Sequence, residues 1–355
     1  MEERLGKTNI LEIESIPKLL RKFAVPSVIS LLVNALYNIV DQIFIGRGVG
    51  YLGNGATNVI LPLVVMNMAI CMLFGDGAAT FFSVKLGEKK EDQACHAVGN
   101  AIVCGIITGI ITCTVFNIGL QFFCRLTGAT DNIMPYALEY GHIIISAFPA
   151  VALIVVTGSI IRADGRPRFT MAGLLVGCGI NVILDYLFVI RFQWGVKGAA
   201  WATVIGELAN AVMFFCYLFH FKCIRLHKKA FQLNKIYVLQ IMKLGISSFA
   251  TQLSAVLIMI VMNRLLVFYG RASIYGEDIP MTAMGVTMKI NQILLSLMTG
   301  IAAGALPIIG FNYGARKYKR VKQTIRLAII SAMLCGVIAT FFFPFPIIVT
   351  FKVQR

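Results

Sequence analysis

Long apolar runs recur along the whole of this 355-residue chain and constrain its fold more than any other feature. A helix needs about 20 residues to cross the hydrocarbon core of a bilayer. Hydrophobic residues make up 58% of the chain and charged residues only 14%, whereas a soluble domain has about 25% charged residues. We therefore expect an all-α, polytopic helical membrane protein. Its predicted spans are 19–45, 56–84, 96–123, 136–161, 169–190, 198–221, 244–268, 282–310 and 324–343.

The Lys and Arg residues are distributed unevenly between the loops that join these runs. The N-terminus and every second loop carry 23 of them, against six in the alternate loops. Basic residues collect in the cytoplasmic loops of membrane proteins, so the N-terminus is expected in the cytoplasm. The same rule explains the net charge of +16 without nucleic acid as a partner. The expected partners are the lipid bilayer and small molecules, and the expected location is the inner (plasma) membrane.

The chain divides into two parts at its longest basic stretch, residues 222–243. Six predicted spans precede this stretch, and a spaced pattern of four residues before it recurs after it: Gly77-Ala78, Gly87 and Lys90 match Gly304-Ala305, Gly314 and Lys317. Parallel repeats of six helices are typical of transporters with a binding site between the repeats. We predict an N-lobe at 1–221, a cytoplasmic linker at 222–243 and a partial C-lobe at 244–355.

Several motifs in order give the chain a resemblance to the multidrug and toxic compound extrusion (MATE) family. These are Pro26 and Asp41, GRGVGYLGNGATNVILP, GDGAATFFSVKLGEKK, GSIIRADGRP, Asn181-x-x-x-Asp185 and GVKGAAWATVI. The resemblance implies a two-lobe, inverted-V transporter fold of twelve helices. This chain would supply about nine spans of twelve: a six-helix N-lobe, then helices 7–9 and a remnant of helix 10 in an incomplete C-lobe.

Asp41 and Asp185 are carboxylates inside apolar spans, where a charge costs about 2.5–3.5 kcal/mol and usually marks a functional site. At 1.5 Å per residue both lie in the outer part of the membrane, and Thr203 reaches the same level. Two neighbouring carboxylates in a low dielectric take up a proton or hold a cation between them. Alternatively, these polar groups only join helices by hydrogen bonds.

The resemblance assigns the cation-coupling site to Asp41, Asn181, Asp185 and Thr203, with H⁺ or Na⁺ as the coupling ion. Helical spacing places further polar residues on the same faces of their spans. The candidate cavity-lining residues are Asn34, Tyr37, Asn38, Glu207, Asn210, Gln252 and Lys289. Beyond a Na⁺ ion at the coupling site we expect no metal and no cofactor, because the nine cysteines are scattered without a CxxC pair.

These residues lead us to expect a secondary active antiporter, acting as a monomer, that exports lipophilic, often cationic small molecules in exchange for H⁺ or Na⁺. A lipid-linked precursor flippase of the same superfamily and an inactive truncated fragment are the alternatives. We expect no enzyme, because the sequence lacks the paired aspartates or His/Cys motifs of intramembrane enzymes. Asp76, between two glycines, is expected to act in packing at a helix break, and His142 to be a hydrogen-bonded helix residue.

Overall fold

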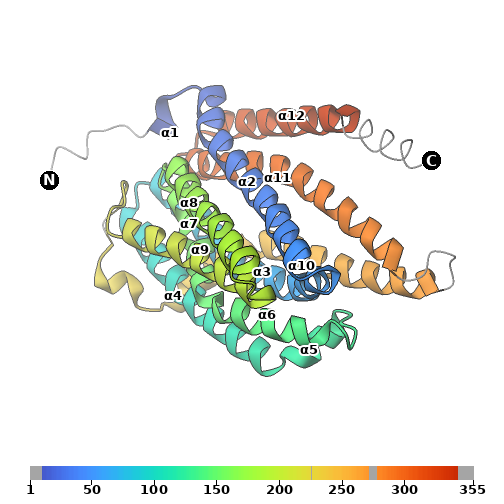
Figure 1. Ribbon diagram of the computed structural model, residues 1–355. Helices are drawn as coiled ribbons and strands as arrows, with labels where there is room; N and C mark the ends of the chain where they lie inside the picture. Colours follow the sequence, from blue (N-terminus) through green and yellow to red (C-terminus); the bar gives the residue numbers. More distant parts are fainter. Residues whose placement is uncertain (1–9, 225, 272–277, 343–355) are drawn as a thin grey trace.

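The computed structural model of the protein describes residues 10–224, 226–271 and 278–342, without the side chains of 263, 267, 271, 278–290 and 338–342. All regular structure in these residues is helical (Figure 1). The elements are α1 (Ile10–Ile13), α2 (Ile16–Gly48), α3 (Tyr51–Gly87), α4 (Glu91–Ile118), α5 (Leu120–Leu126), α6 (Met134–Ser146), α7 (Phe148–Ala163), α8 (Pro167–Asp185), η2 (Tyr186–Arg191), α9 (Gly195–Tyr217), η3 (Lys228–Phe231), α10 (Lys235–Arg271), α11 (Asp278–Gly314) and α12 (Tyr318–Phe342).

The prediction of an all-α, polytopic membrane protein is confirmed. Seven helices in the described residues are long and apolar enough to cross a membrane, and the bent pair α6–α7 would make an eighth span. The ninth predicted span lies on α12, whose last side chains are outside the described residues, so it stays a prediction. The remnant of a tenth helix also lies outside them.

Two predicted spans are not single straight helices. The third divides into α4 and α5 at Gly119, and the fourth bends by 50° between α6 and α7. Pro149, in the first turn of α7, has no backbone N–H to donate to the preceding turn, so the helix restarts there. In addition, α10 begins at Lys235, inside the range predicted as the linker.

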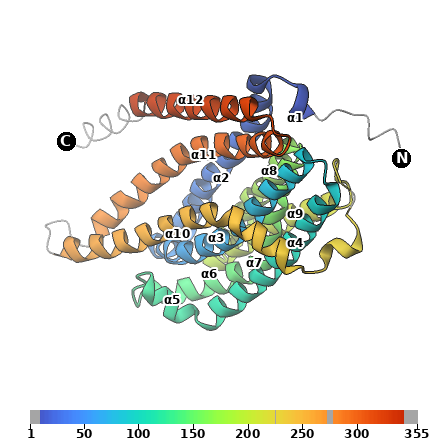
Figure 2. The same cartoon turned by 180° about the vertical axis from the view of Figure 1, so that it is seen from behind.

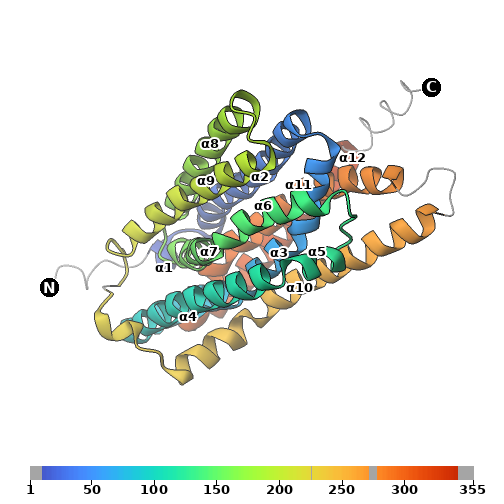
Figure 3. The same ribbon diagram turned by 60° about the horizontal axis from the view of Figure 1, so that its bottom comes forward.

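Helices from the second half of the sequence lie along helices from the first half. Helix α10 packs along α3, and α11 packs along both α2 and α3. Away from these contacts, the end of α10 and the start of α11 extend beyond the bundle formed by α3–α9 (Figures 1 and 2). Figure 3 shows the same ends of α10 and α11 projecting past α5 and α6.

Glycines let the backbones touch where the two halves meet. A Cβ added at Gly77 of α3 would overlap the Ile241 carbonyl oxygen of α10, and one at Gly245 would overlap that of Leu73. Where α11 crosses α2, a Cβ at Gly304 would lie 2.5 Å from the Cα of Ala24. A pair of glycines, Gly87 and Gly314, makes the corresponding contact between α3 and α11. The glycines of the predicted repeat are therefore the residues that permit these crossings.

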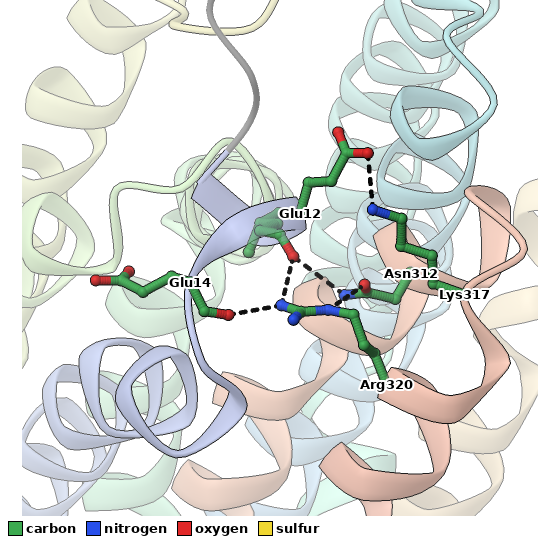
Figure 4. Close-up of polar contacts among 6 residues, drawn as sticks. Glu12, Glu14, Asn312, Lys317 and Arg320 are labelled. Carbon is green, nitrogen blue, oxygen red and sulfur yellow. Dashed lines mark hydrogen bonds and ion pairs between the residues drawn. The ribbon is translucent and has the colours of Figure 1, made fainter.

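Polar contacts tie the N-terminal segment to α11 and α12 (Figure 4). Arg320 donates to the backbone oxygens of Leu11 at 3.1 Å and Glu14 at 2.7 Å, and to Asn312 Oδ1 at 2.9 Å. Lys317 Nζ lies 2.8 Å from Glu12 Oε1, and this hydrogen bond lowers the pKa of Glu12. These six residues form an N-terminal clamp between the start of the described chain and the α11–α12 region.

Arg320→Ala should free the segment 10–15 from α12, because two backbone carbonyls lose a charged donor. Hydrogen bonds to charged groups contribute about 1.5–3 kcal/mol each, so amide hydrogen exchange in this segment should accelerate about 10-fold or more. Arg326→Ala is the matched control, since Arg326 is exposed on the same helix. Equal exchange rates in the two variants would show that the clamp does not hold the segment.

Candidate functional site

The site begins with a close crossing of α8 and α9. A Cβ at Gly177 would lie 2.8 Å from the Gly206 carbonyl oxygen, and one at Gly206 would lie 2.6 Å from that of Gly177. Only small residues allow two helix backbones to approach this closely in a membrane. The side chains one turn away therefore meet: Asn181 Nδ2 donates to Thr203 Oγ1 at 3.2 Å, and both residues are buried.

Asp41 of α2 faces Asp185 at the C-terminal end of α8. Their exposed fractions are 6% and 0%, and the two carboxyl groups are close enough to interact with each other. Oδ1 of Asp41 and both carboxyl oxygens of Asp185 are buried without a hydrogen-bond donor among the described residues. Two ionised carboxylates cannot donate to each other, so the pair needs a shared proton or a bound cation.

A π-helical turn follows Asp185 directly. Residues Tyr186–Arg191 form η2, so α8 loses its regular α-helical hydrogen bonding at the carboxylate. Isolated π-turns inside helices occur frequently at functional sites. Val189 of this turn packs against Gly48 at the end of α2, where a Cβ would overlap its side chain. The irregular turn therefore holds the ends of α2 and α8 together beside the aspartate pair.

Two tyrosines border the aspartate pair. Tyr37 is close enough to Thr203 and to Asp41 to interact with both side chains. Tyr140 of α6, 8% exposed, interacts electrostatically with both Asp41 and Asp185. Sequence reasoning missed Tyr140, because its position depends on the bend between α6 and α7.

Helix α9 adds a third carboxylate, Glu207, one turn after Thr203. Glu207 Oε2 and Asn210 Oδ1 are buried without a hydrogen-bond donor in the described part of the chain. Gly173 of α8 leaves room for this amide, since a Cβ there would lie 2.7 Å from Asn210 Oδ1. No ion pair formed by described residues involves Asp41, Asp185 or Glu207.

Two of the remaining predicted cavity residues, Asn38 and Gln252, do not join this cluster. Asn38 is exposed and donates to the Asn34 backbone oxygen at 2.8 Å, so it bonds to its own helix. Gln252 is half-buried on α10, which packs mainly against α3, α4 and α11 rather than against the helices of the cluster. Lys289 lies on α11, and its side chain is outside the described residues.

Asp76 lies apart from the cluster, in a contact between α3 and α7. Ser159 Oγ donates to Asp76 Oδ1 at 2.8 Å, and Arg162 Nη2 donates to the same Ser159 oxygen at 2.8 Å. Helix α3 continues unbroken past Asp76, so the expected glycine break is wrong. The flanking glycines instead allow close packing: a Cβ at Gly75 would lie 3.1 Å from the Val156 Cα.

His142 forms the hydrogen bond expected of a helix histidine. Its Nδ1 lies 2.8 Å from Asn117 Oδ1, which joins α6 to α4. The prediction for this residue is confirmed.

A buried group of carboxylates in a bundle of membrane-spanning helices is the arrangement expected of a multi-pass membrane protein of the transporter class. Comparison with known sequences gives the family. The MatE sequence model matches residues 26–187 and again 249–353. The chain therefore belongs to the MatE family, whose members are transporters and not enzymes, and the predicted family is confirmed.

Curated relatives include the multidrug export protein MepA of Staphylococcus aureus (strain MSSA476), 28% identical over 315 residues, which are 88% of this chain and 68% of MepA. MepA of Staphylococcus haemolyticus (strain JCSC1435) is 29% identical over 326 residues, 90% of this chain and 69% of that protein. The chain thus spans about two thirds of the length of these relatives.

Solved structures show the same fold. The MATE multidrug transporter DinF-BH in complex with R6G superposes with a TM-score of 0.88 at 28% identity, covering 98% of this chain and 77% of that one. A transporter of the MOP superfamily from Pyrococcus furiosus superposes with a TM-score of 0.86 at 20% identity, covering 95% of this chain and 74% of that one. The first of these structures contains a bound small molecule by its own description.

Proposed function

We propose that this protein exports lipophilic, cationic small molecules in exchange for H⁺ or Na⁺, and that Asp41 and Asp185 bind the coupling ion. The observation that carries the proposal is the buried aspartate pair, in which Asp41 Oδ1 and both Asp185 oxygens have no hydrogen-bond donor in the described part of the chain. A buried charge that lacks a partner costs several kcal/mol, so the site favours binding of a cation or a proton. Asn181 and Thr203 supply the neutral oxygens that suit the same ions.

Binding of the ion would change how three helices pack against one another. Asp41, Asp185 and Thr203 come from α2, α8 and α9, so charge neutralisation acts on all three at once. A ligand shifts a conformational equilibrium only through different affinities for the two states. We infer that the ion favours the state in which the aspartates are close, and that the alternative arrangement separates them.

The two family-model matches and the symmetry of the helix contacts support a division into an N-lobe at 1–221 and a C-lobe beginning with α10. The two matches to the family model fall on either side of the basic stretch. The glycine contacts between the halves are related in pairs: α3 touches α10 at Gly77, and α11 touches α2 at Gly304. Gly77 and Gly304 are equivalent positions of the predicted repeat, so the contacts are those expected of a pseudo-two-fold axis.

These contacts lie at one end of the helices, and the orientation follows from the loop charges. Gly245 and Ala24 lie near the starts of their helices, and Gly304 lies near the end of α11. The positive-inside rule places these ends in the cytoplasm. We propose a multi-pass, monomeric protein of the plasma membrane with a cytoplasmic N-terminus, in a state closed on the cytoplasmic side and open on the outer side.

The substrate class rests on the relatives and on the charge of the site. MepA is a multidrug export protein by name, and the DinF-BH structure holds R6G. The carboxyl groups of Asp41, Asp185 and Glu207, each with at least one buried oxygen that has no donor among the described residues, favour cations over anions in their surroundings. Tyr37 and Tyr140 add aromatic faces that attract organic cations.

The test uses the purified 355-residue chain in lipid vesicles with R6G as the transported dye. A gradient of either protons or Na⁺, imposed across the membrane, should drive R6G against its concentration gradient. The ion that drives transport identifies the coupling ion. If neither gradient moves R6G or other lipophilic cations above the rate of empty vesicles, the proposal is wrong.

A further inference from the structure

The segment between α9 and α10 lies against the first turns of α4. Asn100 Nδ2 donates to the carbonyl oxygens of Ala230 at 3.2 Å and Gln232 at 3.1 Å, and Asn100 Oδ1 accepts from the Asn234 N–H at 2.7 Å. A Cβ at Gly99 would overlap the Ala230 carbonyl oxygen. The segment is therefore held against the helix by three hydrogen bonds and a close backbone contact.

The face of α4 that holds this segment continues toward the helix start with two potential metal ligands. Asp92, His96 and Asn100 follow one another at i, i+4 and i+8, so they lie on one side of the helix. His96 Nε2 is 3.8 Å from Asp92 Oδ2. The segment places His227 beside them, with its ring centroid 5.4 Å from that of His96. Ligand atoms of Asp92, His96 and His227 all lie within 4.8 Å of one another.

We propose that Asp92, His96 and His227 bind a divalent transition-metal ion, with Zn²⁺ as the best fit. Two imidazoles and one carboxylate are a ligand set that Zn²⁺ accepts, with water in the fourth position. Zn–N and Zn–O distances of about 2.0–2.2 Å put tetrahedral ligands about 3.3–3.6 Å apart, so the side chains need to close by about 1 Å.

Neighbouring side chains already orient both imidazole rings. His96 stacks on Tyr237 of α10, with centroids 5.4 Å apart and planes 6° apart. Cys95 Sγ lies 3.4 Å from His227 Nδ1, which leaves Nε2 of that ring for a metal. A ligating histidine commonly uses its other ring nitrogen for such an orienting contact. Because the ligands come from α4 and from the segment before α10, a bound ion would join the two.

Zn²⁺ itself is the probe, measured by competition with a chromophoric chelator against the purified full chain in detergent. The wild-type chain should bind one Zn²⁺ that His96→Gln and His227→Gln each weaken by about 100-fold or more, since loss of even an outer partner costs about 10–100-fold. The chain has four histidines, so His142→Gln and His220→Gln are matched controls. His220 follows the end of α9 and bonds to the Cys216 carbonyl oxygen of that helix at 3.1 Å.

A second measurement locates the ion independently of affinity. Lys228 and Lys229 are exposed beside His227, so trypsin can cut there. Zn²⁺ should slow this cleavage in the wild type and in the two control variants, but not in His96→Gln. Binding that survives loss of His96 and His227, or falls equally in the controls, would overturn the site. Neither outcome depends on transport, so the proposed export function is tested separately.

Discussion

Asp41→Asn and Asp185→Asn should each reduce ion-driven R6G uptake or efflux in vesicles to the rate of protein-free vesicles. Each change keeps the size of the side chain but removes one of the two buried carboxylates that face each other. The remaining single carboxylate accepts a hydrogen bond from the new amide and no longer repels a second carboxylate, so it binds the coupling ion much more weakly. Binding of R6G without a gradient should largely survive, because coupling and not ligand contact is lost.

The matched control is Asp76→Asn, which removes a carboxylate from another place in the same bundle. Asp76 accepts from Ser159 Oγ at 2.8 Å, and the amide oxygen of asparagine can accept the same hydrogen bond. Much of the transport should therefore remain. Full transport in the Asp41 and Asp185 variants, with loss only in Asp76→Asn, would move the coupling site to the α3–α7 contact and contradict our assignment.

The membrane spans were predictable because the hydrophobic effect acts on every residue of a span. A run of about 20 apolar residues predicts a transmembrane helix whatever its neighbours are. Bends and breaks within a span depend on single residues, so they were harder to predict from the sequence. Pro149 bends the fourth span by 50° by removing one donor, and Gly119 divides the third. The start of α10 at Lys235 was missed because Lys235 and Lys243 place its first turns within the basic stretch 222–243.

Helical periodicity accounts for the part of the site that sequence could predict. Asn181 and Asp185 share a face of one helix, and the depth of Asp41 follows from the rise per residue. The neighbours of these residues were not predictable in the same way. Tyr140 interacts with the two aspartates from a span that is bent, and Asn38 donates a hydrogen bond to its own helix backbone instead. His227 lies 131 positions after His96, so only the folded chain brings the two together.

Gly245→Ala should lower the apparent melting temperature of the purified protein more than Gly304→Ala or Gly179→Ala does. A Cβ at this position would overlap the Leu73 carbonyl oxygen of α3, which is backbone and cannot rotate away. Overpacking of this kind costs about 1–3 kcal/mol. This destabilisation exceeds the stabilisation of about 1 kcal/mol that replacing glycine with alanine brings to an exposed helix position. The helices α3 and α10 must therefore separate, which opens the contact between the two halves.

Gly179→Ala is the matched control, because a Cβ there meets nothing within 4 Å. This substitution adds the same methyl group to another apolar helix, so the melting temperature of the variant should stay unchanged or rise. Gly304→Ala provides a second test through the predicted repeat, since the new Cβ would lie 2.5 Å from the Ala24 Cα. It should destabilise the protein as Gly245→Ala does, by forcing α11 away from α2. If Gly245→Ala and Gly304→Ala melt at the temperature of Gly179→Ala, the glycine contacts do not hold the two halves together at this end. The proposed closure on the cytoplasmic side would then lack its structural basis.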